Sequence, residues 1–318
     1  MHLQRGLDGS VGIDARLPSG QEARMRRILV TGANKGIGLA LVEAILAQHD
    51  DTFVYLGSRD LERGRAAAAA LGRKQTTSKD RLEVIALDVA DDESVAEAGG
   101  RVSDSLRGES LYGIVNNAGI GDHERDLAAV FGTNTLGVRR VCETFLPLID
   151  SKAGRIVNVT SAAGPTFVAA CSPARQRFFL DEQITWLQLR AFIDECLAMA
   201  GDAAAFAAKG LGDGAAYGLS KACANTYTLI LAREQPSLRV NACTPGFIAT
   251  DLTRRYAESQ GKSPAQLGMK SPADGVKAPL HLLFGALAGT GHYYGSDAKR
   301  SPLDRYRAPG SPEYTASR

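Results

Sequence analysis

Tyr217 and Lys221 stand four residues apart in the sequence YGLSK, within a segment of helical character. Residues at this spacing project from one face of a helix, about one turn apart. An ammonium about 4 Å from a phenol stabilises the phenolate by about 4 kcal/mol at an effective dielectric constant of 20, which lowers the phenol pKa from about 10 toward neutrality. Such a tyrosine can donate a proton to a carbonyl oxygen while a hydride reaches the carbonyl carbon. The spacing alone does not distinguish this chemistry from packing on a helix surface.

A glycine-rich stretch, TGANKGIG from Thr31 to Gly38, separates a short apolar run from a second apolar stretch of helical character. At such a seam in a parallel sheet, the N-terminus of the helix can bind a pyrophosphate. Gly32 is predicted to permit the tight turn, Gly36 to let the backbone approach the phosphates, and Gly38 to let the helix pack closely. The spacing G-x-x-x-G-x-G is less common than G-x-G-x-x-G, and the alternative is a tight turn without a ligand.

The residues at the end of the second predicted strand favour NADP(H) over NAD(H). About 20 residues beyond the glycines, an acidic residue binds the ribose of NAD, whereas a basic residue accepts the 2′-phosphate of NADP. Ser58 and Arg59 occupy this place, and Arg59 together with Lys35 forms a two-cation cradle for a phosphate. Asp60 follows one position later and is expected to cap the next helix.

The elements that must position these residues alternate between β-branched runs and helical stretches. The strand candidates are RILVTG, TFVYLG, LEVIALD, YGIVNNAG, RIVNVTS and LRVNACTPG, and helices are expected at residues 38–48, 61–71 and 92–106 among others. The strands are apolar throughout, which is typical of parallel strands buried on both faces. The predicted fold class is therefore α/β, a single doubly wound parallel sheet of the Rossmann type with helices on both faces.

Three segments interrupt or flank this alternation. Residues 1–24 are glycine-rich without periodicity, and we expect a disordered leader or cloning remnant, with Met25 as a candidate natural start. Residues 165–213 contain an amphipathic stretch and are expected to form a helical insertion before Tyr217. The tail at 296–318 is rich in Pro and Arg and is expected to be irregular. One reductase-sized domain then covers residues 25–295.

Composition excludes several classes of function. The chain has 318 residues, 44% hydrophobic and 23% charged, with a net charge of +2 and no long basic run, so we expect no nucleic-acid or membrane partner. The apolar stretches are too short to span a bilayer, and no signal-peptide pattern is present, which favours a cytoplasmic protein. The five cysteines are widely spaced, as suits free thiols. No metal is expected, because Asp122–Glu124, the one motif that could hold one, is interpreted as a solvated loop.

The motifs occur in the order typical of the short-chain dehydrogenase/reductase family, which the chain resembles from about residue 26 to residue 295. TGANKGIG matches the cofactor loop of that family, and YGLSK matches its tyrosine and lysine pair. Four further motifs match: NNAG at 116–119 after the fourth strand, NTLG with Asn134, NVTS with Ser161, and TPGFIAT after the sixth strand.

The resemblance implies catalytic roles for four residues. Ser161 would hydrogen-bond and orient the substrate carbonyl, Tyr217 would donate the proton, and Lys221 would lower the tyrosine pKa and hold the nicotinamide ribose. Asn134 would anchor a water in the proton relay. Thr160 remains an alternative to Ser161 for the hydroxyl role.

The resemblance also implies a cofactor site. Its adenosine side would include Asp88, Val89 and Asn116, although Asp88 could instead be a strand-end cap, and Asn116 with Asn117 could be turn residues. Pro245 and Thr250 would hold the nicotinamide end. The full predicted set is Gly32, Asn34, Lys35, Gly36, Ile37, Gly38, Arg59, Asp88, Val89, Asn116, Ala118, Gly119, Tyr217, Lys221, Pro245, Gly246 and Thr250.

The segment between Ser161 and Tyr217 is much longer than in most members of the family. This insertion, with TGANKGIG, SRDLERGRAAAA and ACTPGF, is similar to the monomeric carbonyl reductase branch, which uses NADPH. There the extra helices cover the face through which relatives dimerise and wall one side of the substrate cleft. A monomer is therefore expected, and a surface decoration that leaves dimerisation intact is the alternative.

The resulting hypothesis is an NADPH-dependent reductase acting on an aldehyde, ketone or quinone as a small-molecule substrate. One alternative is an NAD-dependent alcohol or steroid dehydrogenase working in the oxidative direction. Another is a catalytically silent dinucleotide sensor, against which the intact set of Ser161, Tyr217 and Lys221 argues. Four apolar or aromatic residues are candidates either for the substrate cleft or for core packing: Phe167, Trp186, Phe247 and Tyr256.

Overall fold

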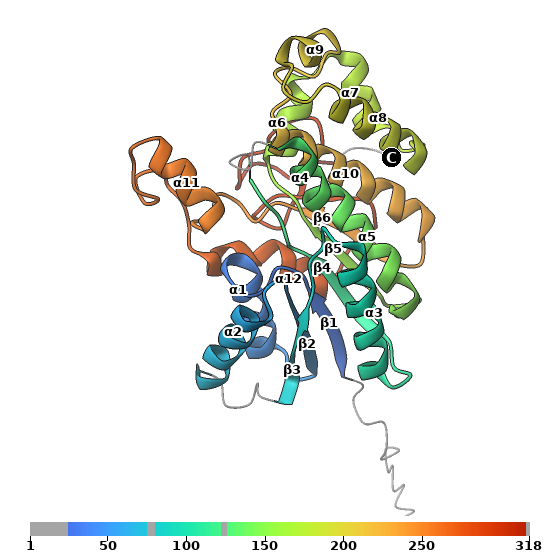
Figure 1. Ribbon diagram of the computed structural model, residues 1–318, viewed down its shortest axis with the longest axis vertical. Coiled ribbons are helices and arrows are strands. Elements are labelled where there is room, and N and C mark those ends of the chain that lie inside the picture. The colour runs from blue at the N-terminus through green and yellow to red at the C-terminus, as the bar shows by residue number, and fades with distance from the viewer. Residues whose placement is uncertain (1–24, 75–79, 122–125, 316–318) are drawn as a thin grey trace, which may run out of the picture.

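The computed structural model describes residues 25–74, 80–121 and 126–315 and is built around one eight-stranded sheet (Figure 1). The strand order is β3-β2-β1-β4-β5-β6-β7-β8, with every neighbouring pair parallel except β7 and β8. The strands are β1 (Arg26–Val30), β2 (Thr52–Ser58), β3 (Leu82–Ala86), β4 (Leu111–Asn116), β5 (Arg155–Val159), β6 (Arg239–Cys243), β7 (Tyr293–Tyr294) and β8 (Arg300–Ser301). The predicted leader at 1–24 and the motif at 122–124 lie outside the described residues.

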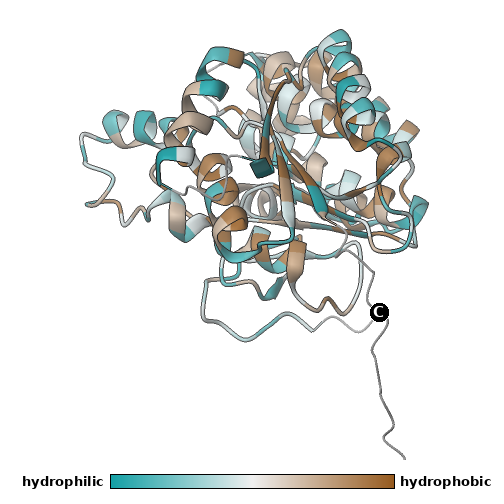
Figure 2. Cartoon of the chain, turned by 90° about the horizontal axis from the view of Figure 1, so that it is seen from below, coloured by the Kyte–Doolittle hydropathy of each residue, from teal (hydrophilic) through white to brown (hydrophobic). Residues whose placement is uncertain are grey.

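Helices cover both faces of the sheet. One layer contains α1 (Gly36–Gln48), α2 (Leu61–Lys74) and α12 (Lys277–Phe284); the other contains α3 (Asp92–Leu106), α4 (Leu127–Phe131), α5 (Gly137–Phe145) and α10 (Ala216–Glu234). The apolar strands feed both cores: Ile28 and Val30 face the first layer, and Leu29 faces the second. Hydrophobic residues accordingly gather along the sheet and the helix sides toward it (Figure 2). The predicted doubly wound fold is confirmed.

The residues predicted as an insertion form helices at the end of the molecule shown at the top of Figure 1. These are α6 (Ala163–Ala170), α7 (Pro173–Leu180), α8 (Trp186–Ala198) and α9 (Ala203–Ala208). They are fixed to the second layer, since the Thr226 hydroxyl of α10 donates to the Phe179 carbonyl at 3.3 Å. The Trp186 ring lies 4.1 Å from the Arg139 guanidinium carbon and packs edge-to-face on Tyr227. The insertion therefore packs on α10 and α5.

The tail differs from its predicted irregular conformation. It contains β8, which pairs with β7 through Tyr293 opposite Ser301. Arg307 forms an ion pair with Asp297, and their side chains are only 7% and 13% exposed. A two-residue strand and a single buried ion pair leave no periodic signal in a sequence rich in Pro and Arg, which explains the difference.

The remaining elements connect the layers. They are the π-helix η3 (Gly132–Leu136), the 3₁₀ helices η4 (Leu146–Leu148) and η5 (Pro272–Val276), and α11 (Asp251–Ser259), which projects from the body in Figure 1. Within the described ranges no helix has both the length and the apolar character needed to traverse a bilayer. All five cysteines are buried and free.

Candidate active site

Tyr217 and Lys221 lie in the first turns of α10, close to the end of β5. The Lys221 Nζ atom is 5.7 Å from the centre of the Tyr217 ring and donates a hydrogen bond to the Val159 carbonyl at 3.3 Å. Lys221 is 4% exposed, whereas Tyr217 is half-buried. Burial lowers the pKa of the Lys221 ammonium to about 8, so the group remains mainly cationic at neutral pH. Tyr217 and Lys221 thus lie close together on one face of α10, near the end of β5, as predicted.

Ser161 is brought to this location by close packing of α6 on α10. A Cβ atom on Gly164 would come within 3.1 Å of the Ala222 nitrogen, and one on Gly218 within 3.1 Å of the Phe167 Cβ. Glycine is therefore needed at both positions for the helices to approach. Two glycines inside helical stretches are the sequence signal for such an approach, and this signal is not among the predictions made above.

The hydroxyl group available after β5 belongs to Ser161. Its Oγ accepts a hydrogen bond from the Ala163 backbone at 3.2 Å, and the residue is partly exposed. Thr160, the alternative, is 4% exposed, and its hydroxyl donates to the Cys243 carbonyl on β6. The structure thus favours Ser161 for contact with a ligand.

Asn134 lies in the π-helix η3 and is fully buried. Its amide forms two 2.9 Å hydrogen bonds to the backbone of Ile120 and one of 3.1 Å to the Ser220 hydroxyl. The side chain therefore ties the loop after β4 to α10, and the role of Asn134 in a proton relay stays a prediction. A Cβ on Gly119 would come within 3.3 Å of the Lys221 Nζ atom, which shows how closely this loop approaches the lysine.

The glycine loop after β1 is packed on the turn after β4. Gly32 has φ +62°, and a Cβ there would come within 2.8 Å of the Ala118 Cα. A Cβ on Gly38 would meet the Asn117 amide nitrogen at 2.5 Å. Gly36 differs, because with φ +57° its Cβ position meets only the Thr250 methyl group at 3.4 Å. Gly32 and Gly38 thus serve packing, and Gly36 leaves space above the backbone.

Asn117 holds this loop in place. Its amide nitrogen donates to the Thr31 carbonyl at 2.9 Å and the Gly32 carbonyl at 3.2 Å. The Thr31 hydroxyl in turn accepts hydrogen bonds from the backbones of Asn117 and Ala118, both at 3.0 Å. Sequence reasoning treated Asn117 only as a turn residue, since nothing local reveals a partner so far away along the chain.

Asn116, its neighbour and a predicted contact on the adenosine side, has its side chain in the protein interior. It is 2% exposed, and its amide donates to the Asn158 side chain at 2.9 Å, which links β4 to β5. Asp88 is partly exposed and accepts a hydrogen bond from the Ala90 backbone, as in the alternative that it stabilises the end of a strand. Val89 is buried.

The end of β2 agrees with the prediction in two respects. Arg59 is exposed, and Asp60 accepts a hydrogen bond from the Arg63 backbone at 3.0 Å, so the carboxylate caps α2. Lys35 differs from the expected free cation, because its ammonium lies 2.7 Å from the Asp251 carboxylate at the start of α11. This ion pair lowers the pKa of the Asp251 carboxyl. It joins the glycine loop to the segment after β6.

The segment after β6 faces the glycine loop. Gly246 has φ +95°, Pro245 beside it is partly exposed, and Thr250 begins α11 with its methyl group toward Gly36. Phe247 and Tyr256 are 42% and 52% exposed, with ring centres 6.2 Å apart.

The other two cleft candidates pack against aromatic rings, Phe167 in the interior and Trp186 at a partly exposed position. Phe167 is 7% exposed and contacts Phe179, and Trp186 packs against Tyr227. Asn34 and Ile37 lie in the glycine loop, partly exposed. No cluster of three potential metal ligands is found among residues 25–74, 80–121 and 126–315.

A doubly wound sheet with a glycine loop after β1 and a tyrosine-lysine pair beyond β5 defines a dinucleotide-binding class of α/β protein. The sequence profile of the short chain dehydrogenase family matches residues 26–173. Carbonyl reductase [NADPH] 1 of Sus scrofa is 33% identical over 273 residues, which cover 81% of this chain and 86% of that protein. A (+)-neomenthol dehydrogenase of Arabidopsis thaliana is 29% identical, covering 82% of this chain and 92% of its own.

Solved structures have the same fold. Salutaridine reductase from Papaver somniferum superposes with a TM-score of 0.69 at 23% identity, over 85% of this chain and 99% of that one, which supports the fold. The chain belongs to the short-chain dehydrogenase/reductase family, and its predicted resemblance to the carbonyl reductases is confirmed. It is thus an oxidoreductase of a family that uses nicotinamide cofactors.

Packing of the glycine loop can be tested without any ligand. Gly38→Ala should lower the free energy of unfolding by about 1–3 kcal/mol, because the added methyl group would overlap the Asn117 amide. Gly100→Ala is the matched control, since Gly100 is an exposed residue of α3 with no atom near its Cβ position. That variant should gain up to about 1 kcal/mol from helix propensity. Urea denaturation measures both, and a Gly38→Ala protein as stable as wild type would contradict the packing account.

Proposed function

We propose that this protein is an NADPH-dependent reductase that converts the carbonyl group of an aldehyde, ketone or quinone to an alcohol. The observation that carries the proposal is the buried Lys221 ammonium beside the Tyr217 ring, with Ser161 at the adjoining end of β5. The similarity to carbonyl reductase [NADPH] 1 of Sus scrofa over most of both chains supports the same reaction class.

The residues present fit a nicotinamide dinucleotide. The Cβ position of Gly36 meets only the Thr250 side chain, and a glycine here suits the close approach of a pyrophosphate to the start of α1. The exposed Arg59 guanidinium at the end of β2 suits a 2′-phosphate, and Lys35 could add a second cation if it exchanged Asp251 for that phosphate. When bound, NADPH supplies the hydride for the reaction.

The side chains of the protein supply the proton and the orientation. Ser161 and Tyr217 would hydrogen-bond the substrate carbonyl oxygen, and Tyr217 would transfer its hydroxyl proton as negative charge grows there. Lys221 stabilises the resulting phenolate until a solvent proton restores the hydroxyl. The carbonyl carbon gains the hydride and the oxygen gains the proton, so the product is an alcohol.

We also propose that the protein is a monomer. The insertion packs on α10 and α5 through Thr226, Trp186 and Arg139. A face already covered in this way is not free to pair with a second copy, which agrees with the expectation from sequence.

Tyr217→Phe tests the proton donor. Turnover should fall by about 10²–10⁴-fold, because the phenylalanine ring has no proton to give, while NADPH affinity changes less than about twofold. Steady-state NADPH consumption with an aromatic aldehyde and the fluorescence of bound NADPH measure the two quantities. Tyr112→Phe is the control, since that hydroxyl donates to the Leu283 carbonyl away from the site. A Tyr217→Phe protein that retains turnover would remove Tyr217 from this role.

Arg59→Glu tests the cofactor preference and separates the proposal from an NAD-dependent dehydrogenase. The kcat/KM for NADPH should fall about 10–100-fold, because a charge-assisted contact with the 2′-phosphate is lost, and that for NADH should change less than about threefold. Arg73→Glu makes the same charge change at the far end of α2 and should leave both values intact. Wild type that prefers NADH, or an Arg59→Glu protein that keeps its NADPH preference, would contradict the assignment.

The pH dependence tests Lys221. Since its pKa is about 8, kcat/KM for carbonyl reduction should decrease as pH rises above about 8, where the ammonium is lost. Lys221→Arg keeps a positive charge to above pH 12, so this decrease should move to a different pH even if the rate is lower throughout. A decrease that remains at the same pH in Lys221→Arg would assign it to another group.

A further inference from the structure

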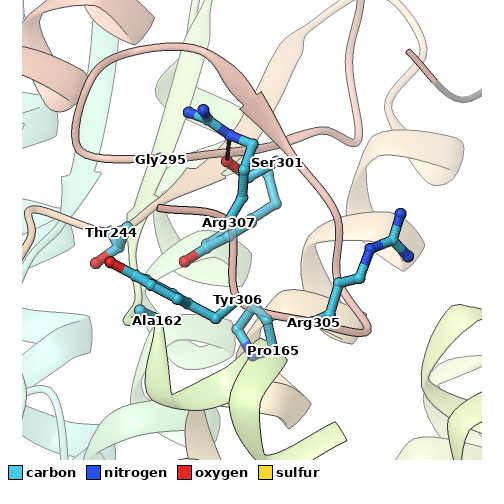
Figure 3. Close-up of a pocket in the computed structure, with 9 residues that line it drawn as sticks. Ala162, Pro165, Thr244, Gly295, Ser301, Arg305, Tyr306 and Arg307 are labelled. Atoms are coloured by element: carbon cyan, nitrogen blue, oxygen red, sulfur yellow. Dashed lines mark hydrogen bonds between the residues drawn. The ribbon is translucent and has the colours of Figure 1, made fainter. Parts of the chain in front are cut away.

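The C-terminal tail lies next to the candidate active site. After β7 the chain turns back, pairs as β8, and places Tyr306 beside a hollow between the ends of β5 and β6 (Figure 3). The hollow is lined by Ala162, Pro165, Thr244, Tyr293, Tyr306 and Arg307 among others. Ala162 follows Ser161 directly, and Thr244 directly precedes Pro245. The hollow that the tail borders is therefore one residue along the chain from Ser161 on one side and from Pro245 on the other.

An ion pair in the tail fixes the loop that carries Tyr306. The Arg307 guanidinium pairs with the Asp297 carboxylate and donates to the Ser301 hydroxyl at 2.9 Å and the Ser311 carbonyl at 2.7 Å. The Gly310 backbone donates to the other Asp297 oxygen at 3.0 Å. Burial alone would raise the pKa of the Asp297 carboxyl, but the hydrogen bond from Arg307 and two backbone donors outweigh it and lower the pKa. The loop is thus held in one arrangement before any ligand binds.

Tyr306 presents an aromatic ring that the protein does not bury. It is 57% exposed, yet its ring spans the hollow above Ala162 and Pro165 with the hydroxyl end toward Thr244 (Figure 3). Arg305 beside it is directed away from the hollow, and pairs with Asp304 at 2.9 Å. Arg305 and Arg307 also line the hollow, but both are paired with carboxylates, so the ring of Tyr306 is the apolar feature offered to a ligand.

Tyr306 is also electrostatically close to the catalytic end of the site. Burial raises the pKa of the Tyr293 hydroxyl, and the neighbouring phenols of Tyr217 and Tyr306 act in the same direction. Tyr293 is 4% exposed and lines the same hollow. Tyr293 is therefore near both the tyrosine proposed as proton donor and the tyrosine of the tail.

We propose that the tail forms a wall of the substrate site and that Tyr306 is a specificity-determining residue, whose ring stacks on flat aromatic carbonyl compounds and quinones. The proposal rests on the proposed reductase function and assigns to one residue a preference among its substrates. Aromatic rings prefer offset or edge-to-face contact with one another, and such contacts add to the burial of apolar area. A small aliphatic aldehyde has no ring that could stack on this wall.

The experiment compares two substrates in three variants. For Tyr306→Ala, kcat/KM with 9,10-phenanthrenequinone should fall about 10-fold through KM, whereas that with propanal should change less than about twofold. Tyr306→Phe keeps the ring and should retain the preference for the quinone. Tyr314→Ala is the matched control, because it removes a tail tyrosine that packs on Arg305 instead of lining the hollow.

The possible outcomes distinguish a failure of the role of Tyr306 from a failure of the proposed reductase function. Wild type that consumes NADPH with neither substrate would refute the reductase function itself. Wild type that reduces both, with a Tyr306→Ala protein of unchanged preference or with equal losses for both substrates, would refute only the role of Tyr306. A uniform increase in kcat/KM for both substrates would also overturn it, because the tail would then obstruct the site.

Discussion

The site depends on keeping one ammonium group inside the protein. Lys221 is buried at the end of β5, where its hydrogen bond to the Val159 carbonyl and the nearby Tyr217 ring replace part of the lost hydration. Burial lowers its pKa only to about 8, so the charge persists at neutral pH. A buried cation stabilises a phenolate far more than an exposed one, because the intervening dielectric constant is lower. The rest of the fold serves to place a phenol, a hydroxyl and a dinucleotide around this charge.

Placement is achieved by backbone approach more than by side-chain contact. Gly164 and Gly218 let α6 pack on α10, which brings Ser161 to the tyrosine helix, and Gly32 and Gly38 let the glycine loop sit on the turn after β4. Asn134 holds the same region from another side by binding the backbone of Ile120. Since these contacts join segments far apart in sequence, a small shift at any of them would displace the site as a whole. The geometry of the site thus depends on close packing of the backbone as well as on the side chains predicted to contact ligands.

Sequence patterns predicted the sheet, the glycine loop and the spacing of Tyr217 and Lys221, because each is encoded locally by periodicity or by the rise of a helix. The role of Asp60 as a helix cap could be predicted for the same reason. The roles of Asn116 and Asn117 were not, since the first pairs with Asn158 and the second with Thr31, and such partners are decided by sheet order. Strand β8 was missed because two residues carry no period. Local sequence patterns therefore predict the candidate catalytic residues but not the long-range contacts that orient them.

The ion pair of Lys35 with Asp251 is exposed, whereas that of Arg307 with Asp297 is buried. The two pairs therefore differ in how easily they can be broken. Lys35 and Asp251 are 60% and 59% exposed, so water and salt weaken their attraction, and pairs of this kind contribute less than about 1 kcal/mol. A phosphate that approached Lys35 could displace Asp251 at little cost. Asp297 and Arg307 are shielded, and breaking them would leave a buried charge unpaired, which is strongly unfavourable. The ion pair at the glycine loop can consequently exchange partners, whereas the ion pair in the tail holds the tail in place.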